Sequence, residues 1–492
     1  MEERNMHRKF DKKPARTLMS KMVGKALLGG AALGLAMTLG TTPAFADEGD
    51  FDNLTPFNRI ARLPVVKDVN GNVDHVATYA KVQAAALALA RYVAYNHDAT
   101  VIGATVIKGA DWVLGGTSAD CRKNLVCNEE EIAKSIIGIP SPEPINPYDP
   151  TYLATGTVTA ANTKKASVLD FCNEHYAKQA LGVSDIVPGK KVVNGYSHTP
   201  TLPCKVSVWN DNEYINVDML DPNAIFTLFF TDALFSAEMA DPAFAEALTD
   251  LPPQVKAEIQ AVVLHAMNEF DDKTKIVDKQ YGPRYKNMDE VVDVVASSPF
   301  QSPYKHVSYT KADGSAFSEI ESTAVAQAII NTMSIHGTTT EGVHSTVINE
   351  AGDTLDSILS TGSSWRSAKA LPMPLPGYNN VIEACSPKYA KMAMSTGLHH
   401  VNALPCKITV KVIDKDKNGT NETLVVSYLD PHFMLNALFA DITDAEKITF
   451  APIPGNIMDD LQKVVRAALD FNLTGITLAN TEGVQISYNM LP

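Results

Sequence analysis

One short stretch occurs twice in this chain. Residues 201–209 read TLPCKVSVW and residues 403–411 read ALPCKITVK, so the two Leu-Pro-Cys-Lys motifs start 202 positions apart. A repeat at a fixed separation is typical of a duplicated structural unit.

The similarity continues on both sides of the motif. Before it, VLDFCNEHYAKQAL (168–181) resembles VIEACSPKYAKMAM (381–394). After it, INVDMLDPNAIFTLFFTD (215–232) resembles LVVSYLDPHFMLNALFAD (424–441). Further on, IQAVVLHAM (259–267) matches LQKVVRAAL (461–469), both with helical periodicity. A chance repeat of this length is improbable, so the sequence predicts a tandem duplication.

The pattern within each copy predicts the fold class. A helix and a strand are followed by an irregular insert, a strand ending at Cys, a helix, the Leu-Pro-Cys strand, a partner strand and closing helices. Proline marks the start of the Leu-Pro-Cys strand, and the alternation after Cys is typical of a half-buried strand. Asp before Pro suits a helix start in both copies. This order favours an α+β fold, a two-layer α/β sandwich, repeated in tandem about an internal pseudo-twofold axis.

The expected boundaries follow from the repeat. We expect two domains joined by a linker, with the first carrying an insert at 108–165. The segments are an export signal (1–46), a lead segment (47–75), the first repeat (76–272), the linker (273–300) and the second repeat (301–492).

The first 46 residues have the composition of a secretory signal. A basic region precedes the uncharged apolar run ALLGGAALGLAMTLG (26–40), and small residues stand at Ala44 and Ala46. This pattern predicts cleavage after Ala46 and a periplasmic or secreted protein. The alternative is a membrane anchor, but the run is short for a span of about 20 residues. No later stretch is long and uncharged enough for stable membrane insertion.

Charge excludes one class of partner. The whole chain has a formal net charge of −14, and the signal carries more basic than acidic residues, so the mature chain is more acidic still. Such a surface repels nucleic acid.

At the repeated motifs the chain resembles a known family. The run Cys-Asn/Ser-x-x-Tyr-Ala, then Leu-Pro-Cys with alternating Val/Ile, then a strand into Asp-Pro, is similar to domain-of-unknown-function family 302. VVSYLDPHFML (425–435) is the most similar stretch, and the resemblance covers roughly 165–270 and 380–470. It implies a small α/β domain that often pairs, so two copies in one chain would pack on each other. It implies no catalytic residue.

Six cysteines permit three disulfides in an exported protein. Cys121 and Cys127 could close a small loop; the other four are Cys172, Cys204, Cys385 and Cys406. If the two cysteine-bearing strands of a copy are antiparallel neighbours, their thiols share one sheet edge and could bond. If the strands are parallel, the thiols lie too far apart.

A histidine stands six residues before each Leu-Pro-Cys cysteine, which suggests a ligand site. His198 precedes Cys204, and His400 precedes Cys406. Imidazole and thiolate together suit a metal ion or haem. A thiol–disulfide enzyme is a further alternative, because Cys172 and Cys385 each precede a helix, but the chain has no Cys-x-x-Cys motif.

The segment DKDKNGTNE (414–422) imitates the start of a calcium loop. Asp414, Asp416 and Asn418 stand at the first, third and fifth positions, but Val425 occupies the twelfth, where a bidentate Glu belongs. A hairpin with an Asn-Gly turn accounts for the segment better.

No Walker loop, GxGxxG, GxSxG or HExxH motif occurs in the chain. We therefore expect binding rather than catalysis, with a small ligand, metal or haem in the cleft between the repeats. The alternatives are a thiol-redox or metal-dependent enzyme using the repeated cysteines, and a structural or interaction protein.

Overall fold

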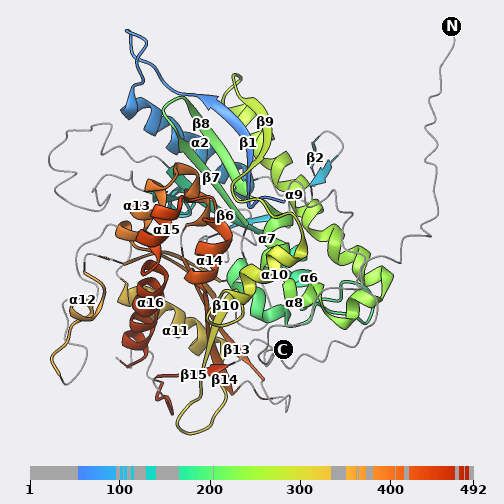
Figure 1. The fold of residues 1–492 in the computed structure, drawn as a ribbon, viewed down its shortest axis with the longest axis vertical. Coiled ribbons are helices and arrows are strands. Elements are labelled where there is room, and N and C mark those ends of the chain that lie inside the picture. The colour runs from blue at the N-terminus through green and yellow to red at the C-terminus, as the bar shows by residue number, and fades with distance from the viewer. Residues whose placement is uncertain are drawn as a thin grey trace. The chain divides into compact units, whose positions relative to one another are not determined.

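Two antiparallel sheets organise the part of the chain described by this computed structural model (Figure 1). The described residues are 54–95, 100–102, 105–107, 112–115, 129–139, 166–202, 204–333, 351–361, 363, 365–372, 380–404, 406–414, 420, 422–470, 476–480 and 482–486. The expected export signal, Cys121, Cys127, Asp416 and Asn418 lie outside these residues.

The first sheet has the order β4-β6-β7-β8-β1-β9, with β5 also paired to β6. Its strands are β1 (Phe57–Pro64), β4 (Trp112–Leu114), β5 (Ile137–Ile139), β6 (Ala166–Asn173), β7 (Cys204–Asn210), β8 (Tyr214–Leu220) and β9 (Lys275–Tyr281). A separate two-stranded sheet pairs β2 (Thr100–Ile102) with β3 (Thr105–Ile107).

The second sheet has the order β11-β12-β13-β14-β10-β15. Its strands are β10 (Tyr304–Tyr309), β11 (Arg366–Pro372), β12 (Asn380–Cys385), β13 (Cys406–Ile413), β14 (Thr423–Leu429) and β15 (Val484–Ile486). In both sheets, therefore, the strand that begins at the Leu-Pro-Cys cysteine lies between the strand that carries the other cysteine and its own hairpin partner.

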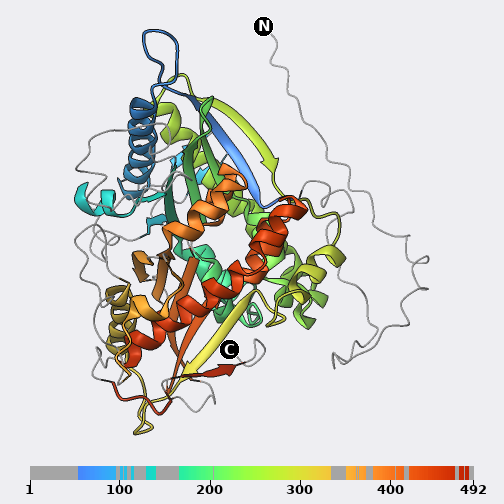
Figure 2. The same ribbon diagram turned by 60° about the vertical axis from the view of Figure 1, so that its left-hand side comes forward.

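Helices cover each sheet (Figures 1 and 2). In the first half, α2 (His75–Tyr95) packs on β6 and β7, and α9 (Pro242–Phe270) packs on α2. In the second half, α11 (Glu319–Thr332) packs on β11 to β13, and α16 (Ile453–Asp470) packs on α11. This mixture of helices with antiparallel sheets is the expected α+β class.

Shorter helices connect these elements. In the first half they are α4 (Glu129–Lys134), α6 (Glu174–Ala180), the 3-10 helix η2 (Gly195–Thr201), α7 (Pro222–Phe229), α8 (Thr231–Leu234), η3 (Ala237–Ala240) and α10 (Met288–Ala296). In the second half they are α12 (Leu355–Ile358), α13 (Pro387–Ser395), η5 (Leu398–Ala403), α14 (Pro431–Leu438) and α15 (Asp444–Phe450). No helix among the described residues is long and apolar enough to cross a bilayer.

The first sheet extends beyond the residues expected for the first repeat, 76–272. The lead segment 47–75 contributes β1, which pairs with β8, and the linker 273–300 contributes β9, which pairs with β1. The first sheet thus takes two of its strands from segments expected to lie outside the domain. The sequences of β1 and β9, FNRIARLP and KIVDKQY, lie outside the repeated stretches, so the repeat does not predict these two strands.

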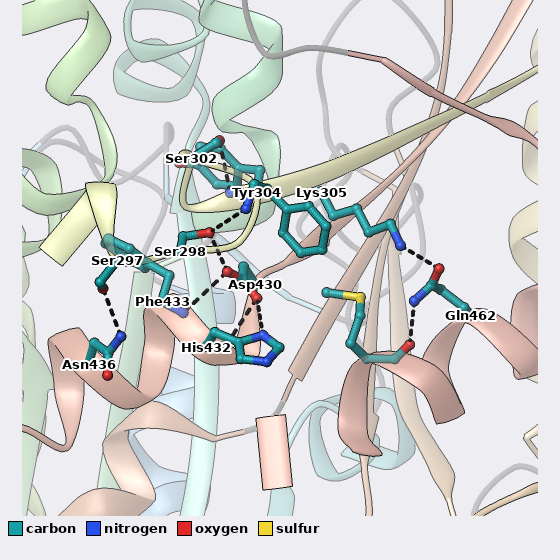
Figure 3. Close-up of polar contacts among 12 residues, drawn as sticks. Ser297, Ser298, Ser302, Tyr304, Lys305, Asp430, His432, Phe433, Asn436 and Gln462 are labelled. Atoms are coloured by element: carbon teal, nitrogen blue, oxygen red, sulfur yellow. Dashed lines mark hydrogen bonds and ion pairs between the residues drawn. The ribbon is translucent and has the colours of Figure 1, made fainter. Parts of the chain in front are cut away.

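The shared Asp-Pro begins a helix in both halves, as expected. Asp221 accepts the backbone N–H of Asn223 at 2.9 Å and caps α7. Asp430 caps α14 by accepting the N–H groups of His432 (3.0 Å) and Phe433 (3.3 Å), and it also accepts the Ser298 hydroxyl at 2.5 Å (Figure 3). The cap of α14 therefore also holds the end of α10.

The Leu-Pro-Cys strands are not half-buried, contrary to expectation. Lys205 and Lys407 follow the cysteines and are only 4% and 2% exposed. The polar face of each strand is covered by the other half: Lys407 Nζ donates to the carbonyl of Leu202 at 2.9 Å, and Ser207 donates to the side-chain carbonyl of Asn402. Alternation of polar and apolar residues here marks two buried faces of different chemistry.

Candidate ligand cavities

Among the described residues, each half contains a cavity with an almost wholly apolar lining. The first has a volume of about 90 Å³ and the second about 80 Å³, and neither is sealed from solvent. The first lies between the ends of strands β6, β7 and β8 and the helices α6, α7 and α9. The second lies against α13, α14, α15 and α16. The cavities are thus within the halves, and the cleft expected between the repeats is filled at Lys407 and Ser207 by side chains.

The linings correspond residue by residue in type. The first includes Trp112, Cys172, Tyr176, Cys204, Pro222 and Phe230. The second includes Trp365, Cys385, Tyr389, Cys406, Pro431 and Phe439. Because the lining offers few polar partners for water, such cavities favour apolar guests.

A buried carboxylate accepts hydrogen bonds from two aromatic residues in the wall of the first cavity. Glu258, on α9 and 6% exposed, accepts the indole N–H of Trp112 at 2.7 Å and the hydroxyl of Tyr176 at 2.5 Å. A charged acceptor with two donors holds both aromatic rings in place.

The second cavity has a corresponding buried carboxylate. Asp460, on α16 and fully buried, accepts the indole N–H of Trp365 at 2.9 Å and the hydroxyl of Tyr389 at 3.5 Å. Its other oxygen accepts the backbone N–H of Ser360 at 2.8 Å. Glu258 and Asp460 each immediately precede the matched helical stretches at 259–267 and 461–469, so they too stand 202 positions apart.

The four described cysteines are free thiols. In each half the two cysteine-bearing strands are antiparallel neighbours, which is the arrangement that would permit a disulfide. However, the register places Phe171 opposite Cys204 and Ala384 opposite Cys406. Each other cysteine, Cys172 or Cys385, is therefore one residue out of register, and no disulfide joins either pair in this structure.

Burial controls the chemistry of these thiols. Desolvation raises the pKa of Cys204 and of Cys385 to about 12 and that of Cys406 to about 11, and it raises the pKa of Cys172 further. Lys407 and Lys205 oppose the shift from the facing half, but they do not overcome it. Neutral thiols are poor nucleophiles and poor metal ligands, so they act here as small apolar groups of the cavity wall.

The repeated histidines pair with the aspartates at the ends of the matched stretches 215–232 and 424–441, Asp232 in α8 and Asp441 after α14. His198 Nε2 lies 2.8 Å from Asp232 Oδ1, and His400 Nε2 lies 3.1 Å from Asp441 Oδ1. Both imidazoles are fully buried. Burial lowers the pKa of His400, while the two neighbouring imidazoles hold the pKa of Asp441 well below its usual range.

An aromatic ring separates each histidine from its cavity. His198 stacks on Phe230 with ring centroids 4.0 Å apart, and His400 stacks on Phe439 at 4.3 Å. The phenyl rings line the cavities together with the cysteines, whereas the imidazoles face the aspartates.

The described residues contain one group of three that could hold a metal ion, and it includes no cysteine. The group is His399, His400 and Asp441. In the expected calcium segment the structure describes Asp414 but not Asp416 or Asn418, and the flanking β13 and β14 form the expected antiparallel hairpin.

A layer of buried charge lies where the halves meet. Asp170 is the cross-strand neighbour of Lys205, and Glu383 is that of Lys407. All four are at most 4% exposed. Burial and the nearby Lys205 lower the pKa of Lys407 to about 8, although Asp170 and Glu383 act in the opposite direction. Residues of both halves thus share one electrostatic environment.

Sequence reasoning missed the carboxylate and tryptophan of each cavity. Trp112 and Trp365 lie in the segments of unequal length that precede the matched stretches, so the repeat does not pair them. A signal for the carboxylates did exist, since acidic residues directly precede the matched helices. The shared Tyr-Ala-Lys also marked Tyr176 and Tyr389, which the structure places in the cavity walls.

These features define an α+β protein with two similar apolar cavities. Residues 366–467, which hold most of the second cavity, match the family model described as "Domain of unknown function DUF302". The match confirms the resemblance for the second half of the chain. No curated protein and no solved structure matches the chain.

Proposed function

We propose that this chain is an exported protein that binds small apolar molecules, one in each cavity. The observation that carries the proposal is the recurrence of one cavity design in both halves: an apolar lining, two neutral thiols, and a Trp–Tyr pair held by a buried carboxylate. Export rests on the signal pattern of residues 1–46, and the acidic charge disfavours nucleic acid as a partner.

The cavity size limits the ligand. One water needs about 10–15 Å³ of such space, so 80–90 Å³ accommodates a molecule of several non-hydrogen atoms. Few polar groups reach the interior, so the ligand class is a compact hydrocarbon, haloalkane or small aromatic ring. Benzene is a suitable probe for both cavities.

Thiol chemistry is less well supported than binding. An attacking cysteine needs a lowered pKa, whereas burial raises the pKa of all four described thiols. Metal or haem held by His198 with Cys204, or His400 with Cys406, also has less support, because each imidazole faces an aspartate.

We also infer that the two halves arose by duplication of one DUF302-like unit. Corresponding strand orders support this inference, as do three features at the same 202-residue offset: the histidines, the Leu-Pro-Cys cysteines and the cavity carboxylates. The pairing of two copies about a pseudo-twofold axis would account for the shared layer of buried charge.

Matched variants test the ligand proposal. Ala177 lines the first cavity and Ala390 the second, and both follow the tyrosine of the Tyr-Ala-Lys motif. Ala177→Leu and Ala390→Leu add three carbon atoms, which would occupy the space of the ligand. Benzene binding to the mature chain is measured by isothermal titration calorimetry, with thermal denaturation as a check on folding.

The wild-type protein is expected to bind two benzene molecules, each single variant one, and the double variant none. A folded wild-type chain that binds no benzene would overturn the proposal and favour a structural role. Unchanged stoichiometry in the double variant would place binding elsewhere.

A further inference from the structure

The group formed by His399, His400 and Asp441 lies outside the two cavities. His399 and His400 are consecutive residues of η5, and Asp441 follows α14. His399 Nε2 lies 3.0 Å from Asp441 Oδ2, and His400 Nε2 lies 3.1 Å from Asp441 Oδ1. One carboxylate thus faces two imidazole nitrogens.

A hydrogen-bond acceptor beside His400 sets the proton position of its ring. The Thr396 hydroxyl donates to the carbonyl of Ala393 at 2.8 Å, so its oxygen is left to accept from His400 Nδ1, which lies 2.8 Å away. Nδ1 therefore carries the hydrogen. Nε2, the other ring nitrogen, faces the Asp441 carboxylate, and a cation bound between them would be held by both groups.

The spacing of the three groups suits a transition metal. Tetrahedral ligands at about 2.1 Å from zinc lie roughly 3.4 Å from one another. One ligand atom of each residue, an imidazole nitrogen or a carboxylate oxygen, lies within 4.8 Å of the other two. This limit is about 1.4 Å longer than the tetrahedral spacing, and movement of the partly exposed His399 and Asp441 side chains would close the difference.

The surroundings leave room for His399 and access for an ion. A Cβ at position 397 would lie 2.5 Å from Cε1 of His399, so Gly397 gives this ring its space. The side chains of His399 and Asp441 are 24% and 27% exposed, whereas that of His400 is 1% exposed. Asp441 also borders an open surface hollow whose lining includes Arg284, Glu290 and Asp293, so its carboxylate is accessible from solvent.

We propose that His399, His400 and Asp441 bind one divalent transition-metal ion, with Zn²⁺ as the best match to two imidazoles and a carboxylate. This set differs from the His–Cys sites expected from sequence. The first half provides an internal control: GYSH (195–198) stands where the second half has GLHH (397–400), so Ser197 replaces the first imidazole. His198 and Asp232 alone form a pair that lacks the third ligand.

The test uses untagged mature chain, stripped with EDTA and then titrated with ZnCl₂ and with CoCl₂. Bound zinc is measured by mass spectrometry of the metal after dialysis, and cobalt by its visible absorption. His399→Ser reproduces the residue of the first half at a partly exposed position, and Asp441→Asn preserves shape. Asp232→Asn is the matched control, and circular dichroism verifies folding of all variants.

The wild-type chain is expected to retain one zinc ion. His399→Ser and Asp441→Asn should each lower the affinity for zinc at least 100-fold. Asp232→Asn should change that affinity less than threefold. The cobalt spectrum should follow the same order. A folded wild-type chain that retains no zinc, or a His399→Ser variant with wild-type affinity, would overturn the proposal. Neither result bears on benzene binding in the cavities.

Discussion

The indole nitrogen of Trp112 donates to the carboxylate of Glu258 at 2.7 Å, across 146 positions of the sequence. The same relationship joins Trp365 to Asp460 at 2.9 Å. In each half, a buried acid on the long helix fixes the aromatic wall of a cavity that the sheet alone would leave open.

The two carboxylates should respond differently to amide substitution. Asp460 accepts from two groups that can only donate, the indole N–H of Trp365 and the backbone N–H of Ser360. In Asp460→Asn, the amide NH₂ must face one of these donors. We expect a loss of about 1–3 kcal/mol in the free energy of unfolding, measured by urea denaturation.

Glu258→Gln is the matched comparison for that change. One partner of Glu258 is the Tyr176 hydroxyl, which can reverse and accept from the new amide. We therefore expect a smaller loss, below about 1 kcal/mol. Equal losses in the two variants would show that hydrogen-bond direction does not govern these walls.

The thiols should be unreactive in the folded protein. Because burial raises the pKa of Cys406 to about 11 and those of Cys204 and Cys385 to about 12, almost no thiolate is present at pH 8. We expect iodoacetamide to modify these three residues and Cys172 at least 100-fold more slowly in the folded chain than in urea. Peptide mass spectrometry measures each site separately, and rapid modification of Cys172 or Cys385 in the folded state would favour the thiol-enzyme alternative.

Lys411 should oppose folding at neutral pH. Burial lowers its pKa from 10.5 to about 7, and its amino group donates to the carbonyl of Tyr196. Between these two pH values the unfolded chain binds a proton that the folded chain does not, so this residue makes stability rise with pH. We expect Lys411→Met to stabilise the protein by roughly 1–2 kcal/mol at pH 6, with the gain shrinking as the pH approaches 10.

Lys256 provides the opposite case for the same substitution. Its amino group lies 2.6 Å from Asp221, whose carboxylate is 1% exposed. Lys256→Met leaves that buried charge with fewer partners, so we expect destabilisation at pH 6. Urea denaturation at several pH values measures the free energy of unfolding of both variants. If Lys411→Met lowered it at every pH, the claim that burial of Lys411 opposes folding would be contradicted.

Removal of the α14 cap should destabilise both the start of α14 and the contact with Ser298 after α10. Asp430 accepts from the first turn of α14 and from Ser298 at the end of α10, as Figure 3 shows. We expect Asp430→Ala to lower the free energy of unfolding by about 2 kcal/mol, at the upper end for a helix cap. Ser298→Ala should lose less, because it removes one donor and leaves the cap intact.

Local signals in the sequence predicted the elements that depend on neighbouring residues. Both Leu-Pro-Cys strands begin at the cysteine, and both Asp-Pro pairs cap a helix. Sequence could not reveal that β1 and β9 complete the first sheet, because pairing across more than 150 residues leaves no local pattern. Nor could it show that Lys205 and Lys407 are buried. The alternation of polar and apolar residues indicates that a strand has two different faces, but it does not indicate which face is exposed to solvent.

The most direct measurement of the central claim is a crystal structure of the mature chain under xenon pressure. Xenon enters apolar cavities without needing a polar contact. The account requires xenon in both cavities, beside Trp112 with Cys204 and beside Trp365 with Cys406. Xenon absent from both, in crystals whose side chains fill the space, would contradict the claim that this protein holds two apolar ligand sites.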